Sequence, residues 1–257
     1  MKQIFIVLIL IASAFAQDYS FRKYKHVENF YEFLAPKAIE VGLEYNVPPA
    51  AILAIAGLES GYGQGYVAKI TGNILSLGAW KGDKTLPPLY LPTHVKTNMV
   101  IYDPDIIKKY ESKKEKLLWK KRPPSLKRDY RPVKFAGTKD NLEYFSKHKK
   151  EFALAEKACL IDFSSRWISK TRSKHLKPFI DTRIYLDKLV KEKGQEVLFT
   201  TAVNKRFINM LGGKKYSFNY RKTWPKKVNN IMKKVGLVEL CKKIYFEKKN
   251  FKEAWSK

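Results

Sequence analysis

A short apolar stretch that ends in a single carboxylate constrains this chain more than any other feature. Residues 48–60 begin with two prolines, which suit the first turn of a helix because a missing N–H costs nothing there. Almost every residue that follows is apolar, so most of the helix surface must be buried. Gly61 and Gly63 predict its end. The stretch therefore predicts a buried helix whose only charge is Glu59, in the last turn.

Glu59 stands in an unusual place for a glutamate with only a structural role. Ile52, Ile55 and Ala56 share its helical face through the i, i+3, i+4, i+7 spacing. The negative end of the helix dipole and partial burial both disfavour the ionised carboxylate. Both effects favour the protonated side chain that a general acid needs. We therefore expect Glu59 to be a catalytic acid.

The charge of the whole chain narrows the class of partner. There are 51 Lys and Arg residues against 24 Asp and Glu residues, a formal net charge of +27. Such a balance indicates a polyanionic partner, which could be nucleic acid, anionic lipid or a wall polymer that carries carboxylates. Hydrophobic residues make up 45% of the chain, which is enough for a real core and excludes wholesale disorder.

The first residues predict export. Lys2, the apolar run at residues 4–11 and the small residues Ala14 and Ala16 together predict a signal peptide over residues 1–16. An uncleaved membrane anchor is the alternative, although the apolar run is short for a span. No later stretch is apolar enough to cross a bilayer, so we expect no stable membrane insertion and a periplasmic or secreted protein. Export counts against a nucleic-acid partner and favours the cell wall.

Cysteine and histidine usage gives little sign of metal chemistry. An oxidising compartment would permit a disulfide between Cys159 and Cys241, but two buried free thiols fit the sequence equally well. The four histidines are scattered, without metal-ligand spacing: His26, His94, His148 and His175. We therefore predict no metal site and no cofactor.

Helical periodicity dominates the rest of the chain. The residue pattern predicts helices over 19–45, 105–121, 140–158 and 195–211, two helices over 160–189 divided near residues 177–178, and a helix over 224–246 with a break at Gly236. It predicts short strands over 82–104 and 131–135. The helix at 105–121 is rich in lysine, which fits either a solvated face or a patch facing an acidic polymer. We expect one domain over residues 17–246 and a frayed tail over 247–257.

Glycine, aromatic and amide residues gather after Glu59, over residues 61–80. The glycines predict tight turns and close backbone approach. Rings stack on pyranose faces and amides bind hydroxyl groups, so the mixture suits a sugar-binding cleft. Tyr62 is a candidate for sugar contact because it is close to the acid. Trp80 is another candidate, although it equally fits an ordinary, partly buried aromatic residue.

With these residues in view, the chain resembles a known family. Residues 47–63, followed by Gly72-Asn73-Ile74-Leu75, are similar to the bacterial endo-β-N-acetylglucosaminidases, including the Bax-like and flagellar proteins. The shared pattern is an apolar helix ending in Glu-Ser-Gly-aromatic-Gly, then a Gly-Asn-apolar-apolar turn. Weaker similarities lie at residues 135–145 and 216–228. The resemblance covers roughly residues 40–234.

The resemblance implies an α+β, mostly helical, lysozyme-like domain with a small β-region beside the catalytic helix. Glu59 would be the general acid, and Tyr216 the catalytic tyrosine of the cleft, with Tyr220 as its rival. Asn73 would shape the cleft wall and bind substrate. The partner would be the glycan strands of peptidoglycan, cut by a monomer without a cofactor. The chain departs from the family's pattern at Ser76-Leu77-Gly78 and in the basic segment 108–134.

The sequence leaves open both the catalytic mechanism and the choice between several functions. Glycoside hydrolysis usually needs a second carboxylate, but one enzyme carboxylate suffices where the substrate's N-acetyl group assists or where water attacks a stabilised oxocarbenium ion. The candidates, none with a convincing motif, are Asp83, Asp103, Asp105, Glu111 and Glu115. The competing functions are a lytic transglycosylase on the same fold, a non-catalytic wall-binding protein, and an exported nucleic-acid binder that rests on charge alone.

Overall fold

The computed structural model describes residues 19–132, 140–169 and 176–256. The predicted signal peptide lies outside these residues, as does most of the predicted strand at 131–135. The described chain is mostly helical, with a small region of short antiparallel strands. This confirms the predicted α+β, mostly helical class. In the part described, no helix is both long and apolar enough to cross a bilayer.

Thirteen helical segments are described, of which η1 is a π-helix and η3 a 3-10 helix: α1 Lys25–Glu44, α2 Pro49–Ser60, α3 Tyr66–Thr71, α4 Pro104–Ser112, α5 Asp140–Lys147, α6 Lys149–Asp162, η1 Phe163–Ser169, α7 Lys177–Lys193, η3 Gln195–Phe199, α8 Thr201–Leu211, α9 Trp224–Val235, α10 Leu237–Tyr245 and α11 Phe251–Trp255. The described strands are β1 Thr85–Leu86, β2 Tyr90–His94, β3 Leu117–Lys121 and β4 Ser125–Arg128.

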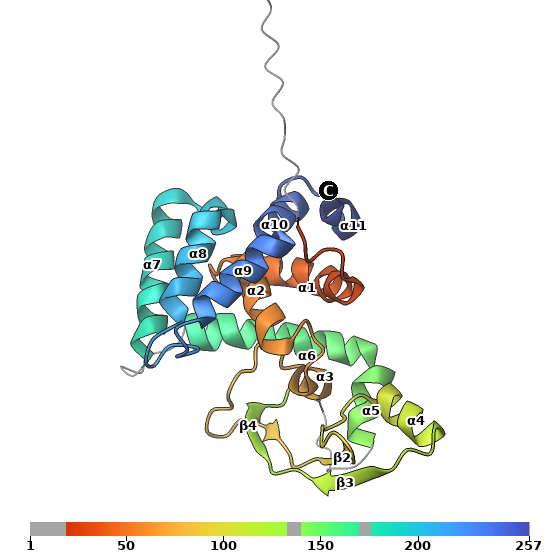
Figure 1. Ribbon diagram of the computed structural model, residues 1–257. Helices are drawn as coiled ribbons and strands as arrows, with labels where there is room; N and C mark the ends of the chain where they lie inside the picture. Colours follow the sequence, from red (N-terminus) through yellow and green to blue (C-terminus); the bar gives the residue numbers. More distant parts are fainter. Residues whose placement is uncertain (1–18, 133–139, 170–175, 257) are drawn as a thin grey trace, which may run out of the picture.

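The helix predicted at residues 48–60 is the centre of a helical body. α2 packs against α1, α8, α9 and α10, and these helices surround it in Figure 1. The residues from Ala50 to Ala56 are fully buried, as an apolar run without a polar face requires. The large apolar core of the molecule is therefore built around α2.

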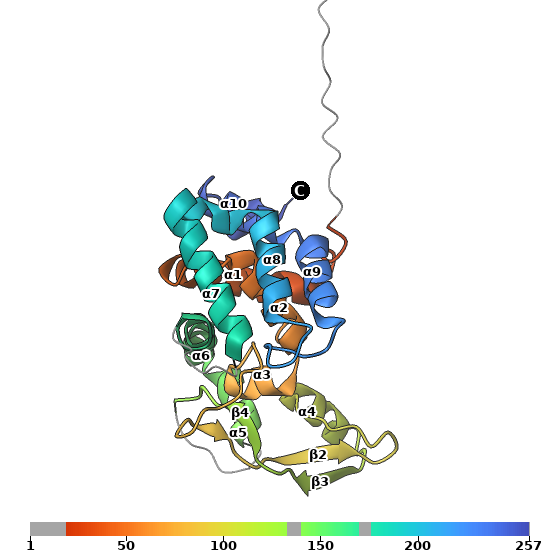
Figure 2. The same ribbon diagram turned by 90° about the vertical axis from the view of Figure 1, so that its left-hand side faces the viewer.

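The strands form a separate region below the helical body (Figures 1 and 2). β2 pairs with β3 from Tyr90 opposite Lys121 to His94 opposite Leu117, and β1 pairs with β4. A second, smaller apolar cluster lies here: Ile70, Leu86, Leu89, Leu91, Ile101, Ile107 and Leu142. α6 runs between this region and the helical body (Figure 1), and contacts both α1 and α5.

The helix predicted over residues 105–121 is wrong in its second half. α4 ends at Ser112, and residues 117–121 form β3 instead. Leu117 and Trp119 alternate with more exposed residues, and backbone pairing with β2 decides the conformation. Long-range strand pairing overrides local helical preference here.

The frayed tail predicted over residues 247–257 is also wrong. Asn250 and Glu253 form a capping box at the start of α11. Phe251 and Trp255 are each 8% exposed, and their rings stack on each other. Arg22 donates hydrogen bonds to the carbonyl groups of the last turn. A satisfied helix start and buried aromatic rings order this segment.

Candidate active site

Glu59 lies at the end of a helix that is otherwise almost wholly buried. α2 ends against Gly61, whose φ of 56° lies in the left-handed region that favours glycine. Ile52, Ile55 and Ala56 share a face with Glu59 and are fully buried, whereas Glu59 is half-buried. The buried face therefore fixes the position of this one carboxylate at the edge of the helical body.

One side chain donates a hydrogen bond to Glu59. Nε1 of Trp224 donates to Oε1 of Glu59 over 2.7 Å. The indole is buried against Gly212, where a Cβ would lie 2.1 Å from the ring. No described residue makes a hydrogen bond to Oε2 of Glu59. Oε1 is therefore engaged by the indole, and Oε2 is the oxygen left to meet a bound molecule.

A positive charge from the strand region faces the same carboxylate. Nζ of Lys127, in β4, donates to the carbonyl oxygen of Ser76 over 2.5 Å. Burial lowers the pKa of Lys127, and the negative charge of Glu59 opposes that shift. Glu59 is therefore bonded to Trp224 of the helical body and interacts electrostatically with Lys127 of the strand region. Sequence reasoning missed both neighbours, since no local pattern marks them.

The loop that precedes Trp224 carries both predicted cleft tyrosines. Phe218 anchors the loop at residues 212–223, because its ring packs against Trp224 with the two centroids 5.6 Å apart. Tyr216 is 52% exposed and Tyr220 is 71% exposed. The structure thus places both tyrosines on the loop that leads into the partner of Glu59, with much of each ring open to solvent.

Asn73 holds a turn and does not face a ligand. Its side chain is 1% exposed. Nδ2 donates to the carbonyl groups of Leu77 and Arg128 over 2.9 Å and 3.0 Å, and Oδ1 accepts the N–H of Leu77 over 2.8 Å. The prediction that Asn73 binds substrate is therefore wrong as direct contact, because its amide is buried and occupied. It fixes the turn after α3 against β4.

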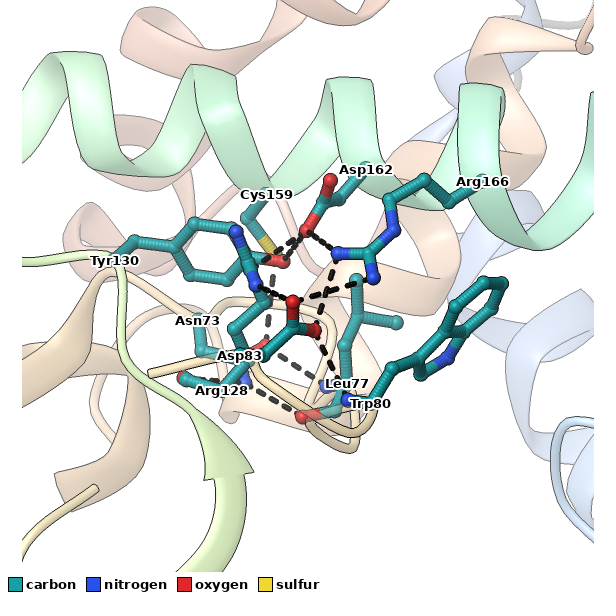
Figure 3. Close-up of polar contacts among 9 residues, drawn as sticks. All are labelled: Asn73, Leu77, Trp80, Asp83, Arg128, Tyr130, Cys159, Asp162 and Arg166. Carbon is teal, nitrogen blue, oxygen red and sulfur yellow. Dashed lines mark hydrogen bonds and ion pairs between the residues drawn. The ribbon is translucent and has the colours of Figure 1, made fainter. Parts of the chain in front are cut away.

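Two aspartates and two arginines form a network beside Trp80 (Figure 3). Asp83 pairs with Arg128 at 2.6 Å and with Arg166 at 3.1 Å. Asp162, at the end of α6, pairs with the same arginines at 2.7 Å and 3.4 Å. The guanidinium of Arg166 lies 4.5 Å from the centre of the Trp80 ring. The network ties the strand region to α6 and η1 and holds Trp80, which is 37% exposed.

Asp83, a candidate second carboxylate, is a structural anion in this network. Burial alone would raise the pKa of Asp83, but hydrogen bonds from the Trp80 N–H and from both guanidinium groups outweigh burial and lower it. An aspartate held by two arginines is poorly placed to act as a base, since its lone pairs already accept strong hydrogen bonds.

The other candidate carboxylates lie in or near α4, in the strand region. Asp103 caps the start of α4 and pairs with Lys69 at 2.6 Å. Asp105 and Glu111 lie on the exposed side of α4, and Glu115, in the turn after it, lies 3.3 Å from His94. Among the described residues, no second carboxylate contacts Glu59. Asp103 therefore has a structural role as a helix cap, and none of these residues hydrogen-bonds to Glu59 in the described part of the chain.

Tyr62 packs against α1 and lines a pocket that Glu59 does not line. Its ring meets His26, Phe30 and Tyr31 edge-on, with centroids 5.8 to 6.3 Å apart. Burial raises the pKa of Tyr62 to about 12. The pocket has a volume of about 490 Å³. The structure therefore gives Tyr62 a role in this pocket, and sugar contact stays a prediction.

Neither cysteine forms a disulfide. Cys159 and Cys241 are buried free thiols, the second of the two possibilities that the sequence left open. Burial raises the pKa of both thiols, that of Cys159 to about 12, so neither is a ready nucleophile. Within the described ranges, no three histidine, cysteine or acidic side chains come together as metal ligands would.

Comparison with known proteins leaves the site to be interpreted from its own residues. No family model matches this chain, and no curated protein or solved structure does so. The features that bear on function are Glu59, the hydrogen bond that it accepts from Trp224, and the exposed rings of Trp80, Tyr216 and Tyr220.

Proposed function

We propose that this chain is a peptidoglycan hydrolase that cuts the glycan backbone as an endo-β-N-acetylglucosaminidase, with Glu59 as general acid. One observation carries the proposal: a half-buried carboxyl group at the end of α2 has Oε1 held by Trp224 and Oε2 available. A general acid needs a fixed position, a neutral form and one oxygen directed at the reacting atoms. The end of α2 supplies the fixed position and the available oxygen.

A lysozyme-like fold forms part of this proposal. The helix that bears the acid is the buried centre of a helical body, and a small strand region lies beside its C-terminal end (Figure 1). Lys127 from that region interacts electrostatically with Glu59, and Trp224 from the body donates a hydrogen bond to it. A carboxyl group between a helical and a stranded region supports the predicted arrangement of the acid beside a substrate cleft.

The chemistry needs only one enzyme carboxylate. Glu59 gives its proton from Oε2 to the glycosidic oxygen as the bond from that oxygen to the anomeric carbon breaks. The N-acetyl oxygen of the same sugar then bonds to the anomeric carbon and stabilises the positive charge. Water attacks that carbon, reopens the ring formed by the N-acetyl group, and returns a proton to Glu59. The structural roles of Asp83, held by two arginines, and of Asp103, which caps α4, favour this route.

Exposed aromatic rings and positive charge would hold the substrate. Trp80, Tyr216 and Tyr220 each expose enough ring surface to stack on a sugar. The net charge of +27 suits a polymer whose peptide stems carry carboxylates. Export through the predicted signal peptide at residues 1–16 would bring the protein, as a monomer, to this wall in the periplasm or outside the cell.

A lytic transglycosylase is the second candidate, and the same observation favours it. With one enzyme carboxylate, a hydroxyl group of the substrate can replace water and leave an anhydro-sugar end. Glu59 would act first as acid and then as base in that reaction. The two activities differ in their products, not in the role of Glu59.

Product analysis tests the proposal. Purified peptidoglycan is digested with the wild-type protein, with Glu59→Gln, and with Glu192→Gln as a matched control on the exposed side of α7. Mass spectrometry then identifies the new chain ends. We expect reducing N-acetylglucosamine ends from the wild type and the control, and a loss of about 100-fold or more with Glu59→Gln.

Each other outcome has a defined meaning. Anhydro-muramyl ends would show that the protein is a lytic transglycosylase and not a hydrolase. Reducing muramyl ends would show that it cuts the other glycosidic bond. No cleavage by the wild type would support a non-catalytic wall-binding protein. Full cleavage by Glu59→Gln would refute the assignment of the acid.

A further inference from the structure

A second site lies in the pocket that Tyr62 lines. The pocket has a volume of about 490 Å³ and forms where α1, α5 and α6 meet the turn into α4. Several aromatic side chains line it: Phe30, Phe33, Tyr62, Tyr102, Phe145 and Phe152. This volume falls within the range of ligand sites that enclose a small organic molecule.

Glu156 lines the same pocket, from the buried side of α6. It is 4% exposed, and its Oε2 is buried without a hydrogen-bond partner among the described residues. Burial raises the pKa of Glu156 to about 7, and the positive charge of Lys37 limits that rise. A buried carboxyl group without a donor is costly and calls for an explanation.

Lys37 does not supply that partner. Its Nζ has no hydrogen bond of its own among the described residues, and lies 3.1 Å from the centre of the Phe33 ring. No ion pair joins Lys37 to Glu156 in the described structure, although the two charges attract. The cation is therefore held over an aromatic face, and Oε2 of Glu156, which lines the pocket, has no donor among the described residues.

The other charges around the pocket are engaged or exposed. Lys69 and Asp103 pair with each other at 2.6 Å. His26, Asp105 and Lys149 are exposed at the mouth. Glu156 is thus the one charged side chain among the described lining residues that is both buried and without an ionic or hydrogen-bonding partner.

We propose that this pocket binds a small organic cation, an alkyl- or arylammonium whose apolar body lies against the aromatic walls and whose ammonium donates to Glu156. The ammonium would supply the hydrogen-bond donor and the opposite charge that Glu156 lacks. Aromatic rings attract cations through their negative faces, and they also bury the apolar part of such a ligand. The site is separate from Glu59, so it does not depend on glycan cleavage.

Calorimetric titration without any wall substrate tests the site. The probes are 2-phenylethylammonium chloride and its neutral analogue 2-phenylethanol, at about pH 8, where Glu156 is ionised. The proteins are the wild type, Glu156→Gln, and Glu192→Gln as the exposed control. We expect saturable binding of the ammonium to the wild type and to the control. Binding should be at least tenfold weaker for 2-phenylethanol on the wild type and for the ammonium on Glu156→Gln.

Three results would overturn the proposal. These are equal binding of the neutral analogue, equal binding to Glu156→Gln, and no saturable binding of the ammonium to the wild type at concentrations up to about 1 mM. The comparison of two probes on the wild type does not depend on any variant folding. Failure here would leave the role of Glu59 untouched, since no step of the assay uses it.

Discussion

The molecule carries two glutamates whose surroundings differ in one decisive respect. Glu59, at the end of α2, is half-buried and accepts a hydrogen bond from Trp224 over 2.7 Å. Glu156, inside α6, is 4% exposed and has a buried oxygen without a donor. The first carboxyl group can exchange a proton with a molecule in solvent. The cost of burying the second carboxylate is removed only when it binds a proton or when a ligand enters the pocket beside it.

Burial alone does not identify a catalytic acid. Both carboxyl groups are partly or wholly removed from water, yet only Glu59 combines a fixed oxygen with an available one. A general acid must have its proton within reach of the substrate. By this criterion we propose the end of α2 as the site of chemistry and the pocket beside α6 as a site of binding.

The largest effect is expected for Glu156→Gln and should appear as a gain in stability. The pKa of Glu156 is raised from 4.5 to about 7 in the folded protein, because burial disfavours the charge. Its contribution to stability is fully present below the unfolded pKa and is lost as pH rises through about 7. Above that pH the substitution should stabilise the fold by about 3 kcal/mol, since one pKa unit is worth about 1.4 kcal/mol.

Urea unfolding of both proteins between about pH 4 and pH 8 measures this gain, because the difference in unfolding free energy follows the linkage of protons to folding. The difference between the two proteins should grow across that range and then level off. Glu192→Gln, on the exposed side of α7, should show no such trend. A constant difference at all pH values would mean that Glu156 has a partner after all.

A carboxyl group that has ion-pair partners should show the opposite dependence of stability on pH. Asp83→Asn removes the charge that Arg128 and Arg166 share in the network beside Trp80. The pKa of Asp83 is lowered in the folded state, so its stabilising contribution is present at neutral pH and lost as pH falls through the acidic range. We expect a loss of about 2 kcal/mol near pH 7, as for hydrogen bonds to charged groups.

The matched control is Asp181→Asn, which breaks the exposed pair with Lys177. Exposed pairs contribute below about 1 kcal/mol, so this variant should unfold close to the wild type. Urea titration at neutral pH compares the two variants. Equal losses would show that the network beside Trp80 is no stronger than a surface ion pair.

A smaller effect is expected for Trp224→Phe, which removes the donor to Glu59 but keeps an aromatic ring. Loss of a hydrogen bond to a carboxyl group should lower the rate of glycan cleavage by about tenfold. The smaller ring leaves a cavity beside Gly212, and such a cavity destabilises the fold. The rate is therefore measured per folded molecule. Trp119→Phe, in β3, serves as the control. An unchanged rate would show that Glu59 needs no orientation by the indole.

Sequence patterns predicted the helical body because its signals are local. Pro49 at the start of α2 and Gly61 at its end act within one turn, and Gly236, with φ 70°, divides α9 from α10 where the pattern predicted a break. β3 was missed because its partner strand lies about 30 residues earlier in the chain. The capping box of α11 was visible in the residues Asn250 and Glu253, but the burial of the tail was not.

Of the candidate site, the sequence predicted Glu59 but not the residues that surround it. Glu59 stands out in an apolar run, whereas Trp224 lies 165 residues further along the chain, and no spacing rule links the two. Asn73 was misjudged because an amide after a glycine fits a ligand contact as well as a buried turn. Glu156 was overlooked because a glutamate next to Lys157 is typical of a solvated helix, and its burial depends on tertiary packing of α6 that no local pattern predicts.

The rate of peptidoglycan cleavage by Glu59→Gln, measured beside that of Glu156→Gln, tests the central claim most directly. We expect the Glu59 variant to lose about 100-fold or more of the wild-type rate, as removal of a general acid does. Its melting temperature should stay close to that of the wild type, because Gln can still accept the hydrogen bond from Trp224. We expect the Glu156 variant to cleave at the wild-type rate. Cleavage by Glu59→Gln within about twofold of the wild type, or an equal loss in both variants, would contradict the separation of the two sites.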